Sequence, residues 1–178
     1  MFLIANGKTY EMASRSRNAA VPNSKCLLID VDPNCFLPDP EASWCNNARS
    51  ALPGTGTEVG TGRANTALML KGCTSGAGQL AAGSVSGGKK DWFLPALEEL
   101  DAIGSYVNTC ASGCFFHERF DFNYTKSMES SYWSSSQDAD IRPTLAWGVN
   151  FRYPTASLLF LVQFQKDSAR RVRPIRAF

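Results

Sequence analysis

Six cysteines and one histidine, His117, are the side chains of this chain best suited to redox, metal or nucleophilic chemistry. No cysteine pair has the Cys-x-x-Cys spacing, and a lone histidine supplies few zinc ligands, so the pattern argues against a metal site. His117 has no serine or cysteine partner in a recognisable catalytic motif. The even number of cysteines predicts at least one disulfide and leaves the pairing open. The cysteines are Cys26, Cys35, Cys45, Cys73, Cys110 and Cys114.

Two other segments contain residue types that are typical of functional sites. The run Gly54–Gly62 has four glycines, like a phosphate-binding loop, but it lacks the Gly-Lys-Ser/Thr ending. It therefore predicts a turn that enters a helix, with Thr61 as N-cap. The carboxylates Glu98, Glu99 and Asp101 could serve acid–base chemistry, but acidic residues early in a helix are explained by the helix dipole. We expect them on the outer side of that helix.

An oxygen-rich trio, Asp30, Asp32 and Asn34, has the alternation found in calcium loops. The bidentate glutamate that completes such a loop is missing downstream, so the trio alone does not predict a calcium site. We expect no cofactor and no metal.

The composition of the chain restricts its class. Its 178 residues fit one domain with a short arm, and 44% hydrophobic residues allow a substantial core. The net charge of +2 gives no reason to expect a nucleic-acid partner. The basic residues near the end of the chain alternate with Val172, Pro174 and Ile175, which is typical of a final strand. No apolar run reaches the length of a membrane span, and Met1–Ala5 is too short for a secretion signal.

The elements that must position any site divide into an arm and a domain. Residues 1–24 are predicted to form an N-terminal arm, with a hairpin around Asn6–Gly7, and residues 25–178 form the domain. Cys26–Val31 reads as a buried strand, and Trp44 is expected to anchor the loop after it. Helices are predicted over Arg63–Gly72 and after Asp91, with Pro95 at the first helical position and a short helical turn near 79–82 between them. The predicted later strands are Tyr132–Ser136, Leu145–Phe151, Ser157–Phe164 and Arg171–Ile175.

The second half of the chain resembles a family of C-type-lectin-like domains found in bacteria and phages. This family includes the DUF1566 domains, the C-terminal domains of Legionella collagen-like proteins and the lectin fold of formylglycine-generating enzymes. The resemblance implies an α+β fold with two helices packed on a twisted, mostly antiparallel sheet, and long loops that present a ligand site. The matching pieces are Gly60–Leu70, Asp91–Pro95 with Glu98–Leu100, Tyr132–Ser136, Ala146–Trp147 and Arg171–Phe178.

The chain departs from this family between Phe151 and Gln165, where a polar, glycine-containing turn is usual. Here Arg152–Val162 is strongly apolar, so we expect an exposed patch. Domains of this fold serve as variable proteins of diversity-generating retroelements, in which template adenines, mostly in asparagine codons, are replaced at random. Such codons cannot yield Lys, Gln, Glu, Met or Trp, and none of these five types occurs in 138–145 or 152–162.

The resemblance and the departure together predict a non-enzymatic binding protein with a diversified ligand surface at about 136–164. A fixed frame that includes Trp133, Trp147, Phe151 and Arg173 would hold it. The expected partner is a protein or carbohydrate on a cell or virus surface, the expected location is a virion or a bacterial surface, and a homo-oligomer is compatible with both. Strict alternation would turn only half of Leu158–Val162 outward. The expected ligand-binding residues are Asp138, Asp140, Arg142, Gly148, Asn150, Arg152, Tyr153, Thr155, Ser157, Leu159, Phe160 and Leu161.

Three other functions stay open. A formylglycine-generating type of enzyme needs a reactive cysteine pair late in the fold, and no cysteine follows Cys114. A calcium-dependent lectin carries Glu-Pro-Asn and Trp-Asn-Asp ligand sets, and the sequence has neither. A plain adhesin, or an assembly domain of a trimeric fibre, would need neither a reactive residue nor a metal.

Overall fold

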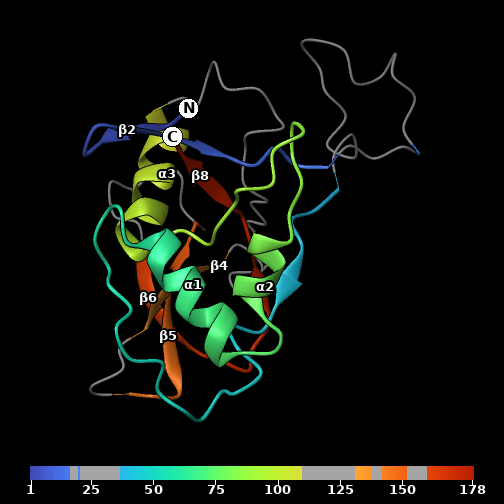
Figure 1. The fold of residues 1–178 in the computed structure, drawn as a ribbon, viewed down its shortest axis with the longest axis vertical. Coiled ribbons are helices and arrows are strands. Elements are labelled where there is room, and N and C mark those ends of the chain that lie inside the picture. Colours follow the sequence, from blue (N-terminus) through green and yellow to red (C-terminus); the bar gives the residue numbers. More distant parts are fainter. Residues whose placement is uncertain (17–19, 21–36, 110–130, 138–141, 152–159) are drawn as a thin grey trace.

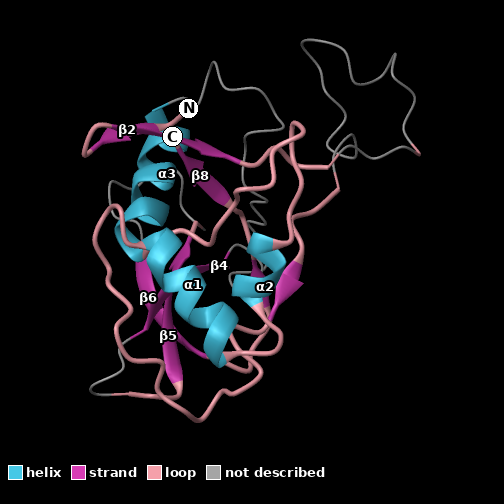
Figure 2. Ribbon diagram, viewed as in Figure 1, coloured by secondary structure: helices cyan, strands magenta, loops and turns pink. Residues whose placement is uncertain are grey.

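The computed structural model describes residues 1–16, 20, 37–109, 131–137, 142–151 and 160–178. These residues form three helices and two sheets, so the predicted α+β class is confirmed (Figures 1 and 2). The predicted strand Cys26–Val31, and the cysteines Cys26, Cys35, Cys110 and Cys114, lie outside the described residues. The boundary between the predicted arm and domain, at residues 24 and 25, lies outside them too.

A three-stranded sheet joins the two ends of the chain. Strands β1 (Leu3–Ala5) and β2 (Lys8–Met12) form the predicted hairpin, in which Asn6 and Gly7 both have positive φ, 51° and 69°. That conformation is the one a two-residue hairpin loop needs, and Asn-Gly adopts it readily. Strand β8 (Ile175–Ala177) pairs antiparallel with β2, so the termini lie side by side at the top of Figure 1.

The second sheet has five strands in the order β3-β7-β4-β5-β6. All its neighbouring pairs are antiparallel except β4 and β7, which run parallel. A register shift between Trp133 and Gln137 marks a bulge in β4. The strands span Glu41–Ala42 (β3), Ser131–Gln137 (β4), Leu145–Asn150 (β5), Phe160–Gln165 (β6) and Arg170–Arg171 (β7).

Three helices occur in the described residues: α1 (Gly62–Gly72), α2 (Ala77–Ala82) and α3 (Leu97–Thr109). The prediction of α1 is confirmed, and the expected turn near 79–82 is a helix of its own. The prediction of Thr61 as the N-cap of α1 is confirmed, although its side chain makes no capping hydrogen bond and its hydroxyl donates to the Glu58 carbonyl. The prediction of Pro95 at the first helical position was wrong. Helix α3 begins two residues after Pro95, whose carbonyl accepts a hydrogen bond from the Ser135 amide.

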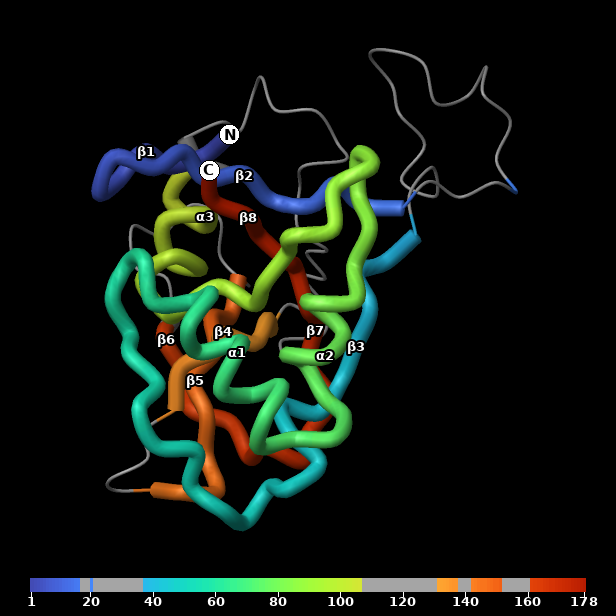
Figure 3. Tube along the Cα trace, in the orientation of Figure 1, coloured from blue at the N-terminus to red at the C-terminus, as the bar shows by residue number. Residues whose placement is uncertain are grey.

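The core consists of two hydrophobic clusters on opposite faces of the five-stranded sheet. Tyr132 and Val149 belong to the first, with the apolar residues of α3, whereas the next strand residue, Trp133, belongs to the second, with Trp44 and Met69. Successive strand residues point to opposite faces, so each face carries its own cluster. Figure 3 traces α1 and α2 in front of the sheet, where the second cluster lies.

The C-terminal segment is not the single strand predicted over Arg171–Ile175. Strand β7 ends at Arg171, β8 begins at Ile175, and the two strands belong to different sheets. Pro174 has no amide hydrogen to contribute to a ladder, and Val172 and Arg173 are buried between the two strands.

The predicted anchor Trp44 is fully buried, and a disulfide joins its neighbour Cys45 to Cys73.

Candidate ligand-binding surface

Strands β5 and β6 carry the described part of the predicted surface. Among the described residues, β6 is one of the two edge strands of its sheet. Leu161 pairs with Val149, and its side chain is 48% exposed. Gln163 and Gln165 follow on the same face, opposite Trp147 and Leu145. We call Leu145, Trp147, Leu161, Gln163 and Gln165 the outward strip.

The outward strip lies on the same face of the sheet as α3, next to the part of that face that α3 covers. Val149, on the same face, is fully buried with the apolar residues of α3. Trp147 is half-buried against the edge of that cluster, and Leu145 is half-buried one step further along. An exposed leucine beside a half-exposed tryptophan gives this edge both apolar area and an aromatic ring, which interfaces favour.

The two predicted contact residues in β5, Gly148 and Asn150, differ in how far they are buried. Gly148 is buried, and a Cβ there would lie 2.5 Å from the Tyr132 carbonyl oxygen and 3.0 Å from the Phe164 ring. The glycine therefore allows a close approach between strands, and its prediction as a ligand contact was wrong. Asn150 is half-buried and pairs with Ser131 and Phe160 at the end of the strand.

The two predicted variable segments leave opposite ends of β5. Residues 138–144 connect β4 to β5, and residues 151–159 connect β5 to β6. Because both connections join antiparallel strands, the six residues of β5 separate them by about 20 Å. Arg142, in the first connection, is exposed. The other predicted contacts lie outside the described residues: Asp138, Asp140, Arg152, Tyr153, Thr155, Ser157 and Leu159.

Aromatic packing and hydrogen bonds hold the strands beneath this surface. Trp133 meets Phe164 edge-on, with ring centroids 5.7 Å apart, and its indole N–H donates to the Ala42 carbonyl. Trp44 donates to the Ser134 carbonyl at 2.8 Å, and the Ser134 hydroxyl donates to the Trp147 carbonyl at 2.8 Å. Strands β3, β4, β5 and β6 are thereby tied together side chain by side chain.

The glycine-rich segment binds an anion of the protein itself. The Glu99 carboxylate accepts hydrogen bonds from the amides of Gly60 and Ala96, at 2.9 and 2.8 Å, and Gly62 also donates to it. The first amides of α1 thus face a negative charge, which a helix N-terminus favours. Burial raises the pKa of Glu99, and the three amide donors lower it in part. The prediction that Glu99 lies on the outer side of its helix was wrong, since the residue is fully buried.

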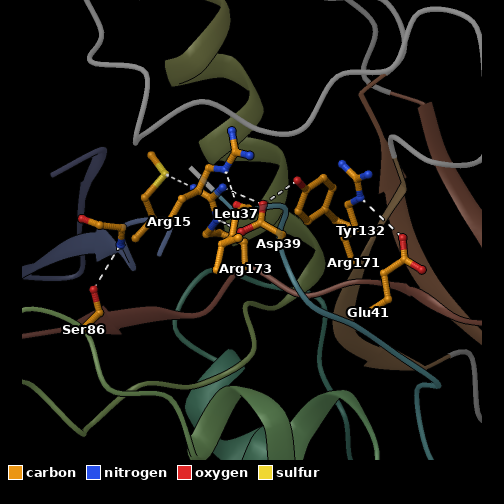
Figure 4. A network of polar contacts seen from close by, with 10 residues as sticks. Arg15, Leu37, Asp39, Glu41, Ser86, Tyr132, Arg171 and Arg173 are labelled. Atoms are coloured by element: carbon orange, nitrogen blue, oxygen red, sulfur yellow. Dashed lines mark hydrogen bonds and ion pairs between the residues drawn. The ribbon is translucent and has the colours of Figure 1, made fainter. Parts of the chain in front are cut away.

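A buried ion pair joins the segment before β3 to the segment after β7. Arg173 donates from Nε and Nη2 to the two carboxylate oxygens of Asp39, at 2.9 and 2.6 Å (Figure 4). The Tyr132 hydroxyl donates to Asp39 Oδ2 at 2.6 Å. Burial, and then the Asp39 charge, raise the pKa of Tyr132 well above its usual value, so the hydroxyl stays protonated. Sequence reasoning placed Arg173 in the frame but missed Asp39, which is 134 residues away.

The surface beside this ion pair is hollowed. A cavity of about 240 Å³ lies between the chain after β2, the loop before β3, the loop after α2 and the chain after β7. Arg15 lies next to the Asp39–Arg173 pair and donates from Nε to the Leu37 carbonyl at 3.1 Å (Figure 4). Burial lowers the pKa of Arg15, and the Asp39 charge partly offsets this effect.

Lys166 is a second buried cation. Its Nζ donates to the Ser50 carbonyl at 2.7 Å and lies 4.8 Å from the centroid of the Trp44 ring. Burial lowers its pKa to about 8. Since the side chain has no exposed surface, it cannot reach a substrate, and its role is to tie the chain after β6 to the second hydrophobic cluster.

Two further findings concern the described residues as a whole. No cluster of three or more His, Cys, Asp and Glu side chains among them could hold a metal ion. No helix within them is long and apolar enough to cross a membrane. The trio Asp30, Asp32 and Asn34 lies outside these residues.

Comparison of the chain with models of known families, with curated proteins and with solved structures returns no match.

Proposed function

We propose that this chain is a non-enzymatic binding protein with a C-type-lectin-like fold, and that the outward strip and its two adjoining segments form its ligand surface. The observation that carries the proposal is Leu161, which is 48% exposed on an edge strand whose Phe164 is buried in the second hydrophobic cluster. Apolar side chains fixed in an exposed position on an ordered frame give contact area without a large loss of entropy on binding. This composition suits a protein ligand.

We further propose that the surface is diversified by a retroelement. Between Gln137 and Gln163, Trp147 is the only residue whose type altered asparagine codons cannot yield. The two glutamines are themselves of such a type. Gln137 is buried, accepts from the Leu52 amide and donates to the Pro143 carbonyl. Gln137 therefore limits the segment at a position that holds the frame, whereas Gln163 limits it within the outward strip. The first of these limits supports a fixed frame with changeable side chains beside it.

The nucleotide sequence around the gene tests this proposal. We expect a nearby, near-identical repeat of the codons for residues 138–162 that differs from the gene only where the repeat has adenine, beside a gene for a reverse transcriptase. Differences spread over all four bases, or concentrated in the codons of buried residues such as Val149, would refute diversification. The control region is the codons for Gly62–Gly72, which should match no such repeat.

Binding separates the other open functions. Chelator should leave binding unchanged, because the proposed surface uses no metal, and loss of binding in chelator would support a calcium lectin instead. Leu161→Asp should abolish binding by placing a charge in an apolar contact, whereas the same change at the exposed Leu70 of α1, which lies outside the outward strip, should not.

A further inference from the structure

The turn that leads into β5 ends at the outward strip. Residues 142–145 form this turn, and the Leu145 amide donates to the Arg142 carbonyl at 3.0 Å. Pro143 occupies the second position, which favours proline because the ring fixes φ near the value that the turn needs. The Arg142 side chain is exposed and takes no part in this hydrogen bond. The turn therefore presents position 142 to solvent beside Leu145 of the outward strip.

Two further carbonyls of the turn accept hydrogen bonds from residues on either side of it. Gln137, at the end of β4, donates from Nε2 to the Pro143 carbonyl at 3.0 Å. Lys166, directly after β6, donates from its main-chain amide to the Thr144 carbonyl at 3.0 Å. Each contact uses a main-chain oxygen, which every residue type has. These contacts therefore do not depend on the side chain at position 142.

The loop before α1 braces both of the residues that hold the turn. The Gln137 side-chain oxygen accepts from the Leu52 amide at 2.8 Å, and the Gln137 amide donates to the Thr55 hydroxyl at 3.0 Å. The Lys166 ammonium donates to the Ser50 carbonyl at 2.7 Å. Positions 50–55 of one loop are thus connected to the ends of β4 and β6 together.

The chemistry of the glutamine side chain suits this double contact. A primary amide carries a donor and an acceptor, and Gln137 directs the acceptor to the loop and the donor to the turn. A carboxylate could only accept, and a hydrocarbon could do neither. Gln137 is 5% exposed, so water would not readily replace a lost partner.

We propose, on the basis of the function proposed above, that Gln137 is the positioning residue for the Arg142 end of the ligand surface. It fixes the main chain of the turn, so that position 142 can change its side chain without moving. A turn that is ordered before binding loses little entropy when a ligand binds. A change at position 142 then alters which ligand is bound, and the surface itself stays formed.

Amide hydrogen exchange of the full-length chain under native conditions tests this role. Gln137→Met removes the donor and the acceptor but keeps a side chain of similar length. In this variant the amides of Leu145 and Lys166 should lose protection roughly tenfold or more, because the turn loses a buried hydrogen bond. The amides of Val149 and Met69, one in each hydrophobic cluster, should keep theirs. A role in overall stability alone would lower the protection of all four amides together.

Variants at two exposed positions are the controls. Gln165→Met makes the same change within the outward strip and should leave the protection of these amides unchanged. Arg142→Ala, Arg142→Phe and Arg142→Asp replace the exposed side chain with three different chemistries. All three should leave Leu145 and Lys166 as protected as in the unaltered chain, because the hydrogen bonds of the turn use main-chain oxygens.

Unchanged protection of Leu145 in Gln137→Met would overturn the proposal. An equal loss at Val149, or failure of this variant to fold, would also overturn it, since either result assigns Gln137 to the stability of the whole fold. Loss of protection in the Arg142 variants would show that the turn depends on its own side chain. Failure of the proposed function looks different: unaltered ligand binding in Leu161→Asp would refute that function and would leave the exchange pattern of the turn as it is.

Discussion

Removing one partner of the Asp39–Arg173 ion pair should be the most damaging single change in the described part of the protein. Both side chains are buried, at 6% and 1% exposure, and Arg173 makes two charged hydrogen bonds to the carboxylate. In Arg173→Met the Asp39 carboxylate would remain buried and would lose two charged hydrogen bonds, while the hydrogen bond from the Tyr132 hydroxyl stays. Breaking a buried pair in this way costs about 3–5 kcal/mol, a large part of a typical domain stability of about 5–15 kcal/mol.

Urea unfolding without reducing agent, followed by tryptophan fluorescence, measures this effect. A loss of about 3–5 kcal/mol should lower the urea midpoint by roughly 1–2 M. The double variant Asp39→Asn, Arg173→Met should recover much of the loss, because no buried charge then lacks a partner. Glu41→Gln is the control: its ion pair with Arg171, at 3.6 Å and with Glu41 half exposed, should contribute less than about 1 kcal/mol.

A loss below about 1 kcal/mol in Arg173→Met would refute this reasoning, since a buried carboxylate that loses two charged hydrogen bonds should destabilise the fold by more than that. A double variant as unstable as the sum of the two single variants would refute it as well. That result would mean that the two residues contribute independently through packing rather than through their charges.

Three further changes test other parts of the frame, each by urea unfolding. Gly148→Ala should lower the free energy of unfolding by about 1–3 kcal/mol, because its Cβ would lie 2.5 Å from the Tyr132 carbonyl oxygen, and an unchanged midpoint would contradict the packing role. Glu99→Ala should cost about 2–4 kcal/mol, because three amides lose their buried acceptor, whereas Glu98→Ala, whose one contact to an amide is exposed, should cost less than about 1 kcal/mol. The folded-state pKa of Lys166, about 8, lies below the unfolded value of 10.5, so the unfolded chain holds the proton more tightly between these values. The free energy of unfolding should therefore rise from pH 8 to 10.5, by up to about 3 kcal/mol, and Lys166→Met should lack this rise; parallel pH profiles would contradict it.

The parts of the fold that the sequence predicted depend on local patterns. Asn6–Gly7 requires a tight hairpin, and the apolar spacing in 63–72 and the alternation in 145–151 are readable without knowledge of any partner. The break between β7 and β8 was missed although Pro174 was visible, because the alternation of basic and apolar residues on either side of it imitates one strand.

The parts that the sequence did not predict depend on contacts between distant segments. Glu99 was assigned to the solvent because its partners, Gly60 and Gly62, precede it by more than thirty residues. The Asp39–Arg173 pair spans 134 residues, and the Cys45–Cys73 disulfide was one of many pairings that six cysteines allow. Strand register was also needed to show that the two variable segments leave opposite ends of β5.

The separation between a fixed frame and changeable outward side chains is tested most directly by a saturation library over residues 142–151 and 160–165, selected for resistance to protease. The account predicts that Arg142 and Leu161, which are exposed, accept nearly every residue type, whereas Ala146, Val149 and Phe164, which are buried, accept few. Equal intolerance at Leu161 and Val149 would contradict it, because an outward position that the fold cannot spare is not free to diversify.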